Sequence, residues 1–514
     1  MVEQKTRADF SIKNATAAMA ARIVVILSGF LTRVVLTHTL NADYVGVNGL
    51  LSNILGALTL SEMGIDTALV YSLYRPVARH DIRKQKALVH LYGRIYPLIA
   101  CAVACAGAVI YPLIRVLMRT RPDVEHFTFI YALYVLNAAG TYLLACRDLL
   151  FLADQRNYIN TWFYSAFLLM QDILQIILLI FTQSYVLFML AQIGCNLMRN
   201  LALYLYSGQC YPFLLDKRSV PVDSKERHSL WRNSAAMLLH KAGSVIINNT
   251  DTLCLTFFSG LRTVGAYANY YLIIGSIRQI ADNAVRGIAG SVGNLAAGGE
   301  RERVSRVFRL TLFGVNLLYG FCAICLFELL NSFVGLVFGE SFVFPVPVSA
   351  VLCLNFYLNG IRQAVLVFRD SLGLFWYDRY KTVAESLVNL GTSILLALRM
   401  GTIGVFIGTT VSIVSVSLWV EPLVLYRKYL LQPVGGYFVL LLRYAAVSAL
   451  AFLAVLAAVR LVGGGAQLTV FLKRLLCCMI VPGAVYWLCF RNTPQYCQLR
   501  SALERYRKNR RADR

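Results

Sequence analysis

The sequence predicts an all-α, polytopic membrane protein of about 14 transmembrane helices, organised as two parallel-repeat six-helix lobes followed by two C-terminal helices. Of its 514 residues, 58% are hydrophobic and 15% are charged, and the mean hydropathy is +0.62. A soluble protein of this length carries more charge. Apolar runs of about 20 residues, the length that crosses the hydrocarbon core, recur along the whole chain. Short sequence matches also recur at a nearly constant separation along the chain.

Fourteen apolar segments meet the length requirement for a membrane span. Their predicted ranges are 17–40, 46–73, 95–117, 127–146, 159–182, 185–206, 233–257, 263–290, 307–330, 345–368, 382–399, 402–426, 436–459 and 468–490. The first segment is longer than the apolar core of a signal peptide and lacks a cleavage site. We therefore expect it to remain in the protein as the first span.

The distribution of lysine and arginine predicts the orientation of these spans. The chain has 49 Lys and Arg against 26 Asp and Glu. If the N-terminus is cytosolic, most basic residues outside the spans fall on the cytosolic side, as the positive-inside rule requires. The opposite side then holds only Arg115, Arg119, Arg121, Arg262, Arg399 and Arg460. Both termini are thus predicted to be cytosolic, and because the basic surplus reflects topology, nucleic acid is not a predicted partner.

An internal repeat underlies the prediction of two lobes. RDLLFLADQRNY at 147–158 and RDSLGLFWYDRY at 369–380 share Arg-Asp, two leucines and a final tyrosine. The other matches, in the same order and at nearly the same separation, are Lys13-Asn14 with Arg232-Asn233, Val45-Gly46 with Val264-Gly265, and Leu205-Tyr206 with Leu425-Tyr426. Ordered matches at a nearly constant shift indicate a repeat. Because six spans separate the copies, an even number, both halves have the same orientation.

The spans and the repeat predict five parts of the chain. These are an N-lobe of spans 1–6 at 1–206, a cytosolic inter-lobe loop at 207–232, a C-lobe of spans 7–12 at 233–430, two accessory spans at 431–490, and a basic cytosolic tail at 491–514. The tail carries eight basic residues against Glu504 and Asp513. It either anchors the orientation of the last span or binds anionic lipid headgroups.

Cations inside the predicted spans are candidates for a binding site, because an intramembrane charge must face water or a partner. Arg22 in span 1 corresponds to Lys241 in span 7 at the shift that aligns Val45-Gly46 with Val264-Gly265, so each half carries a cation in its first helix. Arg33 lies about three turns beyond Arg22 on the same helix face. We therefore predict a cationic site to which both halves contribute.

Span 8 adds Arg278, Asp282 and Arg286, spaced four residues apart on one face. One interpretation is an ion ladder that only joins helices. The other is a binding surface, because two cations against one anion leave a positive charge that needs a partner. The remaining acids of these spans are Glu62, Asp66 and Asp251. These acids, like Asp282, are predicted either to pair with the cations or to bind a coupling cation.

The sequence lacks the motifs of a chemical enzyme. It has no GxxxxGK[ST] loop for nucleotide phosphates and no long outside loop with paired acids for acid–base chemistry. Cys322 and Cys325 form a CxxC, but no second ligand pair lies at a spacing that suits zinc. The histidines, which form no cluster, are His38, His80, His90, His126, His228 and His240. We predict no enzymatic activity, no cofactor and no metal site.

Several segments resemble the bacterial polysaccharide flippases of the multidrug/oligosaccharidyl-lipid/polysaccharide exporter superfamily. The resemblance covers about residues 1–430 and includes loops and span ends as well as apolar runs. The segments that carry it are LNADYVGVNGLLSNILGALTLSEMGIDTALVYSLYRP, LLFLADQRNYI, LHKAGSVIINNTD, VGAYANYYLI, SVGNL, FRDSLGLFWYDRY and GVFIGTTVS.

This resemblance implies a V-shaped pair of lobes that alternates access and moves an undecaprenyl-diphosphate-linked oligosaccharide to the outer leaflet of a bacterial cell membrane. In similar lipid flippases, arginines of the first helix line a cationic cleft for the diphosphate, a role that falls here to Arg22 and Arg33. In lipid II flippases, helices after the twelfth form a groove for the lipid tail, which is the role implied for spans 13 and 14. The implied partners are the lipid-linked oligosaccharide, membrane lipids, a polysaccharide polymerase and glycosyltransferases.

Two other functions are compatible with the same fold. A cation-coupled multidrug exporter is expected to have an acidic cleft that attracts cationic drugs, whereas the intramembrane charges here are mainly basic. A non-transporting scaffold of a glycan-synthesis complex needs no charged cleft at all. The sign of the cleft charge and the effect of cleft mutations on transport distinguish the three.

Overall fold

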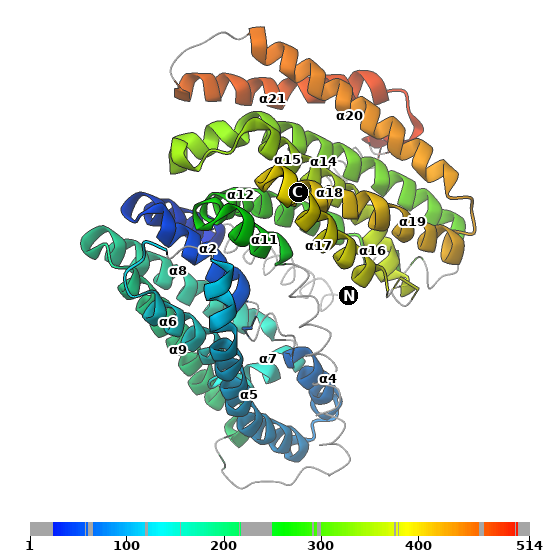
Figure 1. Ribbon diagram of the computed structural model, residues 1–514. Helices are drawn as coiled ribbons and strands as arrows, with labels where there is room; N and C mark the ends of the chain where they lie inside the picture. Colours follow the sequence, from blue (N-terminus) through cyan, green and yellow to red (C-terminus); the bar gives the residue numbers. More distant parts are fainter. Residues whose placement is uncertain are drawn as a thin grey trace, which may run out of the picture. The chain divides into compact units, whose positions relative to one another are not determined.

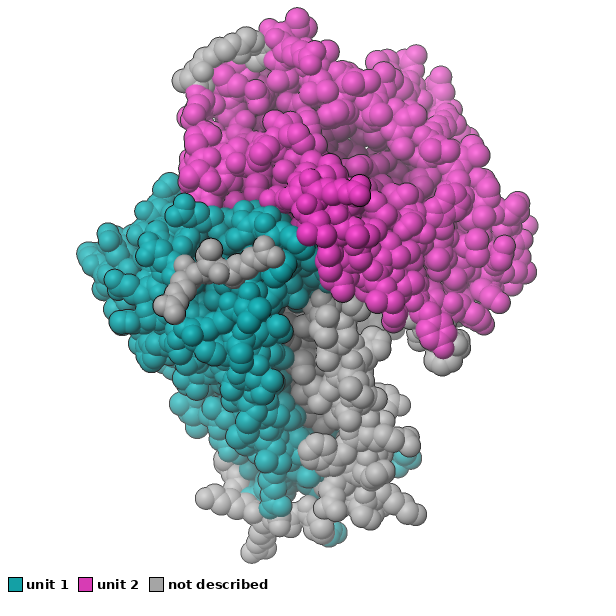
Figure 2. Space-filling model, in the orientation of Figure 1, with its two compact units in different colours: residues 1–265 teal, residues 266–514 magenta. Residues whose placement is uncertain are grey.

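Helices supply all the regular secondary structure in the described part of the chain. The computed structural model describes residues 24–56, 58–59, 65–118, 122–154, 156–214, 216, 249–289, 292–293, 295, 300–374, 377–378, 380–461, 467–498 and 500–501, without the side chains at 65–69, 71, 78 and 157. No strand occurs in these ranges. The chain divides into two compact units, residues 1–265 and 266–514 (Figure 2).

Unit 1 contains long helices, several of which are joined by short turns, such as α8 to α9 (Figure 1). Its described helices are Val24–Thr39, α2 (Ala42–Gly56), α4 (Ile65–Ala78), α5 (Ile82–Leu117), α6 (Phe127–Gly140), α7 (Asp148–Ala153), α8 (Asn157–Thr182), α9 (Tyr185–Cys210) and α11 (Thr250–Ser259), with the 3₁₀ turns Ala145–Arg147 and Pro212–Leu214. The boundary between the units falls inside α12 (Leu261–Arg286).

Unit 2 contains the rest of α12 and the C-terminal helices. These are α14 (Arg301–Phe338), α15 (Val346–Ile361), α16 (Gln363–Ser371), α17 (Lys381–Met400), α18 (Thr402–Ser412), α19 (Leu418–Leu425), α20 (Gly435–Leu461) and α21 (Gln467–Phe490), with a 3₁₀ turn at Glu340–Phe342 and π turns at Ile413–Ser417 and Tyr426–Leu430. α20 and α21 pack against each other and against α14 along one flank of this unit (Figure 1).

The prediction of an all-α, polytopic membrane protein is confirmed. Among the described residues, ten helices are long and apolar enough to cross a membrane, and each coincides with one of the predicted spans. The total of fourteen remains a prediction. The predicted spans outside these ten are 17–40, 46–73, 233–257 and 263–290, which are the first two spans of each repeat. Parts of 17–40, 46–73 and 233–257 lie outside the described residues, and 263–290 corresponds to the charged helix α12.

Within the predicted span 46–73, the described residues belong to two helices, α2 and α4, and to the turn that ends α2. α2 ends at Gly56, where the amides of Leu58 and Thr59 donate to the carbonyls of Leu55 and Gly56, both at 3.0 Å. These three-residue turns tighten and close the helix end. A continuous apolar run is therefore no proof of a continuous helix.

Predicted spans 4 and 10 are both interrupted, and at equivalent places. α6 ends at Gly140, and Leu144 then adopts a left-handed conformation with φ 63° before the 3₁₀ turn that contains Arg147. α15 ends at Ile361, and Arg362 separates it from α16. The shift that aligns Arg147 with Arg369 also aligns Gly140 with Arg362. The repeat thus extends to the irregularities of its helices.

α2 and the first turn of α12 approach so closely that both carry glycine there. A Cβ atom on Gly46 would lie 2.2 Å from the carbonyl oxygen of Leu261, and one on Gly265 would lie 3.0 Å from the amide nitrogen of Gly46. Asp43 and Arg262 form an ion pair nearby at 3.2 Å. The repeat shift of 219 residues aligns Gly46 with Gly265, and it also aligns Asp43 with Arg262. Contact between equivalent residues, here within unit 1, is expected beside a symmetry axis.

Candidate functional site

The first candidate site is a polar cluster around Arg33 in unit 1. Arg33 lies on the helix Val24–Thr39, and its Nη1 donates to Asn48 Oδ1 of α2 at 2.6 Å. The amide of Asn48 donates to the hydroxyls of Tyr134 at 2.9 Å and Tyr185 at 3.0 Å, and these two hydroxyls are 2.8 Å apart. Arg33 Nη2 also lies 3.4 Å from the carbonyl oxygen of Gly265.

This cluster fixes the direction of the Arg33 guanidinium with neutral oxygen atoms from several elements. Tyr134 lies on α6 and Tyr185 begins α9, so the cluster depends on packing between segments far apart in the sequence. The assignment of Arg33 to substrate binding remains a prediction.

The second candidate site is the charged face of α12. Arg278 Nε and Asp282 Oδ2 are 3.6 Å apart, and the hydroxyl of Tyr319 on α14 donates to Asp282 Oδ1. Arg286, one turn further on, is exposed and forms no ion pair with any residue that the structure describes. Asp282 is therefore engaged by Arg278 and Tyr319, and Arg286 contributes the surplus positive charge.

Several predicted site residues lie outside this description. Arg22, Glu62 and Lys241 are not among the described residues, and Asp66 belongs to α4 but its side chain is not described. Asp251 lies in the first turn of α11. The structure therefore groups Arg278 with Asp282 and places Arg33 in its own cluster. That Arg22 and Lys241 both contact one ligand remains a prediction.

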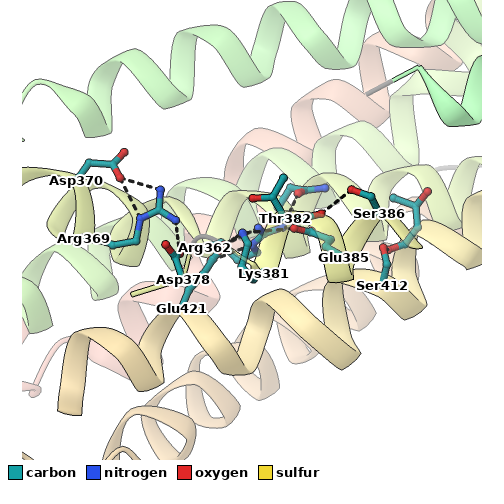
Figure 3. Close-up of polar contacts among 12 residues, drawn as sticks. Arg362, Arg369, Asp370, Asp378, Lys381, Thr382, Glu385, Ser386, Ser412 and Glu421 are labelled. Atoms are coloured by element: carbon teal, nitrogen blue, oxygen red, sulfur yellow. Dashed lines mark hydrogen bonds and ion pairs between the residues drawn. The ribbon is translucent and has the colours of Figure 1, made fainter. Parts of the chain in front are cut away.

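Four charged side chains in unit 2 form a network that was not predicted from the sequence (Figure 3); those of Arg362, Lys381 and Glu421 are less than 10% exposed, and that of Glu385 is 21% exposed. Glu421 on α19 is fully buried and accepts Nη2 of Arg362 at 2.6 Å, Nε of Arg362 at 3.1 Å and Nζ of Lys381 at 2.6 Å. Glu385 lies 3.2 Å from Arg362 Nη1 and 3.4 Å from Lys381 Nζ. The two positive charges of this network equal its two negative charges, so no charge is left over for a ligand. This balance favours a structural role for the network, in which it joins α17 and α19 to the residue between α15 and α16.

A smaller ion cluster lies beside this network. Arg369 Nη1 is 2.5 Å from Asp378 Oδ2, and its Nη2 is 2.7 Å from Asp370 Oδ1 (Figure 3). Its repeat equivalent, Arg147, instead stacks on the ring of Tyr204 at 3.6 Å. The two Arg-Asp stretches thus share a position in the repeat but have different partners.

One signal in the sequence could have identified the missed network. Lys381 and Glu385 are spaced four residues apart at the start of a span, and Glu421 is a single carboxylate in an apolar run. An intramembrane carboxylate needs a partner. Asp172 on α8 is a further such residue; it is buried and accepts the Ser28 hydroxyl at 2.5 Å. Within the described ranges, no group of three or more His, Cys, Asp or Glu side chains is placed to hold a metal ion.

Comparisons with known proteins give a family and a fold. A family model described as "Polysaccharide biosynthesis protein" matches residues 11–292. The structure of "Lipid II flippase MurJ, inward closed conformation" is similar, with a TM-score of 0.72 at 12% identity over 93% of this chain and 99% of that one. A search of curated protein sequences gave no match.

Two multidrug transporters have a related fold. An inward-facing MATE family transporter of the MOP superfamily gives a TM-score of 0.58 at 12% identity over 78% of this chain and 94% of that one. A mutant of the Vibrio cholerae MATE transporter VcmN gives 0.54 at 14% identity over 82% and 98%. At these identities the similarity concerns the fold. The matched structures are a flippase and transporters, in agreement with the prediction that this chain is not an enzyme.

Proposed function

Because the chain belongs to the polysaccharide biosynthesis protein family, we propose that it moves an undecaprenyl-diphosphate-linked oligosaccharide from the inner to the outer leaflet of a bacterial cell membrane by alternating access. The resemblance recognised in the sequence is supported by this family and by the fold shared with a lipid II flippase. Both termini are proposed to face the cytosol. A polysaccharide polymerase and glycosyltransferases are the proposed partners in supplying and using the lipid-linked sugar.

One observation carries the choice of substrate, namely the surplus of positive charge on α12. Arg278 and Arg286 face a single carboxylate, Asp282, which Tyr319 also engages. A diphosphate presents several anionic oxygens that guanidinium groups bind strongly. A cationic drug would be repelled by the same charge.

Outward movement of a diphosphate is favoured by a membrane potential that is negative inside, at about 2.3 kcal/mol per charge per 100 mV. Coupling to an ion gradient is therefore not obligatory for this transport.

Replacing Arg286 by Gln is expected to reduce outer-leaflet delivery of the lipid-linked oligosaccharide by about tenfold or more, because one charge-assisted hydrogen bond contributes roughly 1.5–3 kcal/mol. Delivery is measured at matched protein levels. Arg286→Lys should retain part of the activity. The control is Arg303→Gln, which removes an exposed arginine paired with Glu300 at 2.7 Å on α14.

The control should deliver substrate at the normal rate. Normal delivery by both Arg286→Gln and Arg278→Gln would contradict a diphosphate site on α12. Efflux of a cationic drug that increases when these arginines are removed would favour a multidrug exporter. Depletion of the protein should leave lipid-linked oligosaccharide in the inner leaflet, which a scaffold without transport activity would not cause directly.

A second pair of variants tests the repeat-equivalent cations. Arg22→Ala is expected to abolish delivery and Arg22→Lys to retain part of it, because a guanidinium binds a phosphate through two hydrogen bonds and an ammonium acts as a point charge. Lys241→Arg should be tolerated better than Lys241→Glu. Full activity of both Arg22→Ala and Lys241→Ala would exclude the proposed clamp. Rescue of Lys241→Ala by removal of Asp251 would instead indicate a structural ion pair.

A further inference from the structure

Unit 1 contains a large apolar pocket at the interruption of α6. Its volume is about 1250 Å³, and it lies between α5, the segment from Leu143 to Arg147, and α9. Pockets for drug-sized ligands measure about 300–1,000 Å³, so this one is large enough for a longer molecule. Leu144 is 41% exposed, and on α9 Leu201 is 46% and Leu205 61% exposed. In a membrane, such side chains face hydrocarbon rather than water.

One end of the pocket carries an oriented guanidinium. Arg147 Nη2 donates to the Tyr204 hydroxyl at 2.9 Å and to the Leu214 carbonyl at 3.4 Å, and Nη1 donates to the Tyr204 carbonyl at 3.3 Å. A guanidinium has five N–H donors. The Nε–H and the second Nη1–H have no hydrogen-bond partner among the described residues, and no described carboxylate forms an ion pair with Arg147.

A second arginine stands near the same end. His90 lines the pocket on α5, and Arg94 follows one turn later on the same face. Lys86, one turn before His90, is neutralised by Asp216 at 2.6 Å. The charge at this end of the pocket is therefore positive and, within the described part of unit 1, not compensated.

In unit 2, charged residues stand at two positions equivalent to residues in or near this pocket. The shift that aligns Leu205-Tyr206 with Leu425-Tyr426 also aligns Leu201 with Glu421. Gly140 likewise corresponds to Arg362. Glu421 and Arg362 form an ion pair at 2.6 Å, whereas Leu201, the counterpart of Glu421, is part of the apolar wall of the pocket in unit 1.

We propose that this pocket in unit 1 binds an anionic phospholipid of the surrounding bilayer, with its phosphate on Arg147 and an acyl chain along Leu144, Leu201 and Leu205. The apolar, partly exposed wall selects a ligand that arrives from the hydrocarbon. The uncompensated guanidinium selects an anionic over a zwitterionic headgroup, as basic pockets between membrane helices do. This inference does not depend on the transported substrate.

The test measures lipid retention by the full chain. Protein purified from membranes is equilibrated with equal amounts of phosphatidylglycerol and phosphatidylcholine in detergent, washed, and analysed by native mass spectrometry. Wild type is expected to retain phosphatidylglycerol about fivefold over phosphatidylcholine, the ratio expected from one basic residue near a phosphate. Leu201→Trp fills the pocket and should remove this preference. Leu190→Trp is the matched control, since Leu190 lies on the same helix, is 44% exposed and does not line the pocket.

A second variant covers the case in which Leu201→Trp fails to fold. Gln209 is exposed at the pocket edge, so Gln209→Glu changes charge with little change in shape and should lower phosphatidylglycerol retention about fivefold. Gln498→Glu, at an exposed position outside the pocket, should have no effect. Equal retention of the two lipids by wild type, equal effects of the two tryptophan variants, or retention of lipid-linked oligosaccharide without phosphatidylglycerol would each overturn the proposal.

Discussion

Replacing Glu421 by leucine is expected to destabilise unit 2 by about 3–5 kcal/mol, because it leaves two buried cations with one carboxylate between them. Glu421 is fully buried and receives 2.6 Å contacts from both Arg362 and Lys381. The side chains of both cations are largely buried, at 9% and 7% exposed. The measurement is the thermal unfolding midpoint of purified protein in detergent, together with the amount of protein inserted into membranes.

A charge-balanced double variant shows whether the effect is electrostatic. Glu421→Leu combined with Lys381→Met leaves Arg362 paired with Glu385 at 3.2 Å, and should recover a large part of the lost stability. Glu300→Leu removes a carboxylate from an exposed ion pair and should change stability by less than about 1 kcal/mol. An unchanged unfolding midpoint in Glu421→Leu would show that the network does not stabilise this unit.

Replacing Gly46 by alanine is expected to reduce both stability and transport. The new Cβ would lie 2.2 Å from the carbonyl oxygen of Leu261, and a backbone atom cannot move aside as a flexible side chain can. Inserting a methyl group into a tight contact costs about 1–3 kcal/mol. α2 and the start of α12 must therefore separate, which also disturbs the ion pair between Asp43 and Arg262.

Gly56 provides the matched control for this change. It lies on the same helix, and a Cβ there has no atom within 4 Å, so Gly56→Ala should leave the unfolding midpoint and transport unchanged. If Gly46→Ala and Gly56→Ala behave alike, the close approach of α2 and α12 has no energetic significance. A loss of transport by Gly46→Ala without loss of stability would place this contact in the conformational cycle.

The sequence by itself determined the membrane class, the helical fold and the family, and it predicted the repeat, because all four depend on local patterns. Apolar runs of sufficient length identify spans whatever their neighbours are. The nearly constant separation of the matched segments located the repeat without any contact information, and its copies share the interruptions at Gly140 and Arg362. The surplus of cations on α12 was equally visible in the spacing of Arg278, Asp282 and Arg286.

Only the tertiary structure decided which charged residues have partners. Arg33 was predicted as a site residue, but its partner Asn48 lies on α2, and Asn48 in turn donates to Tyr134 of α6 and Tyr185 of α9. Glu421 meets Arg362 across 59 positions of sequence, and its repeat counterpart Leu201 lines a pocket instead. The physical reason is that the free energy of an intramembrane charge depends on the few ångströms around it, which packing between distant helices sets and no local pattern encodes.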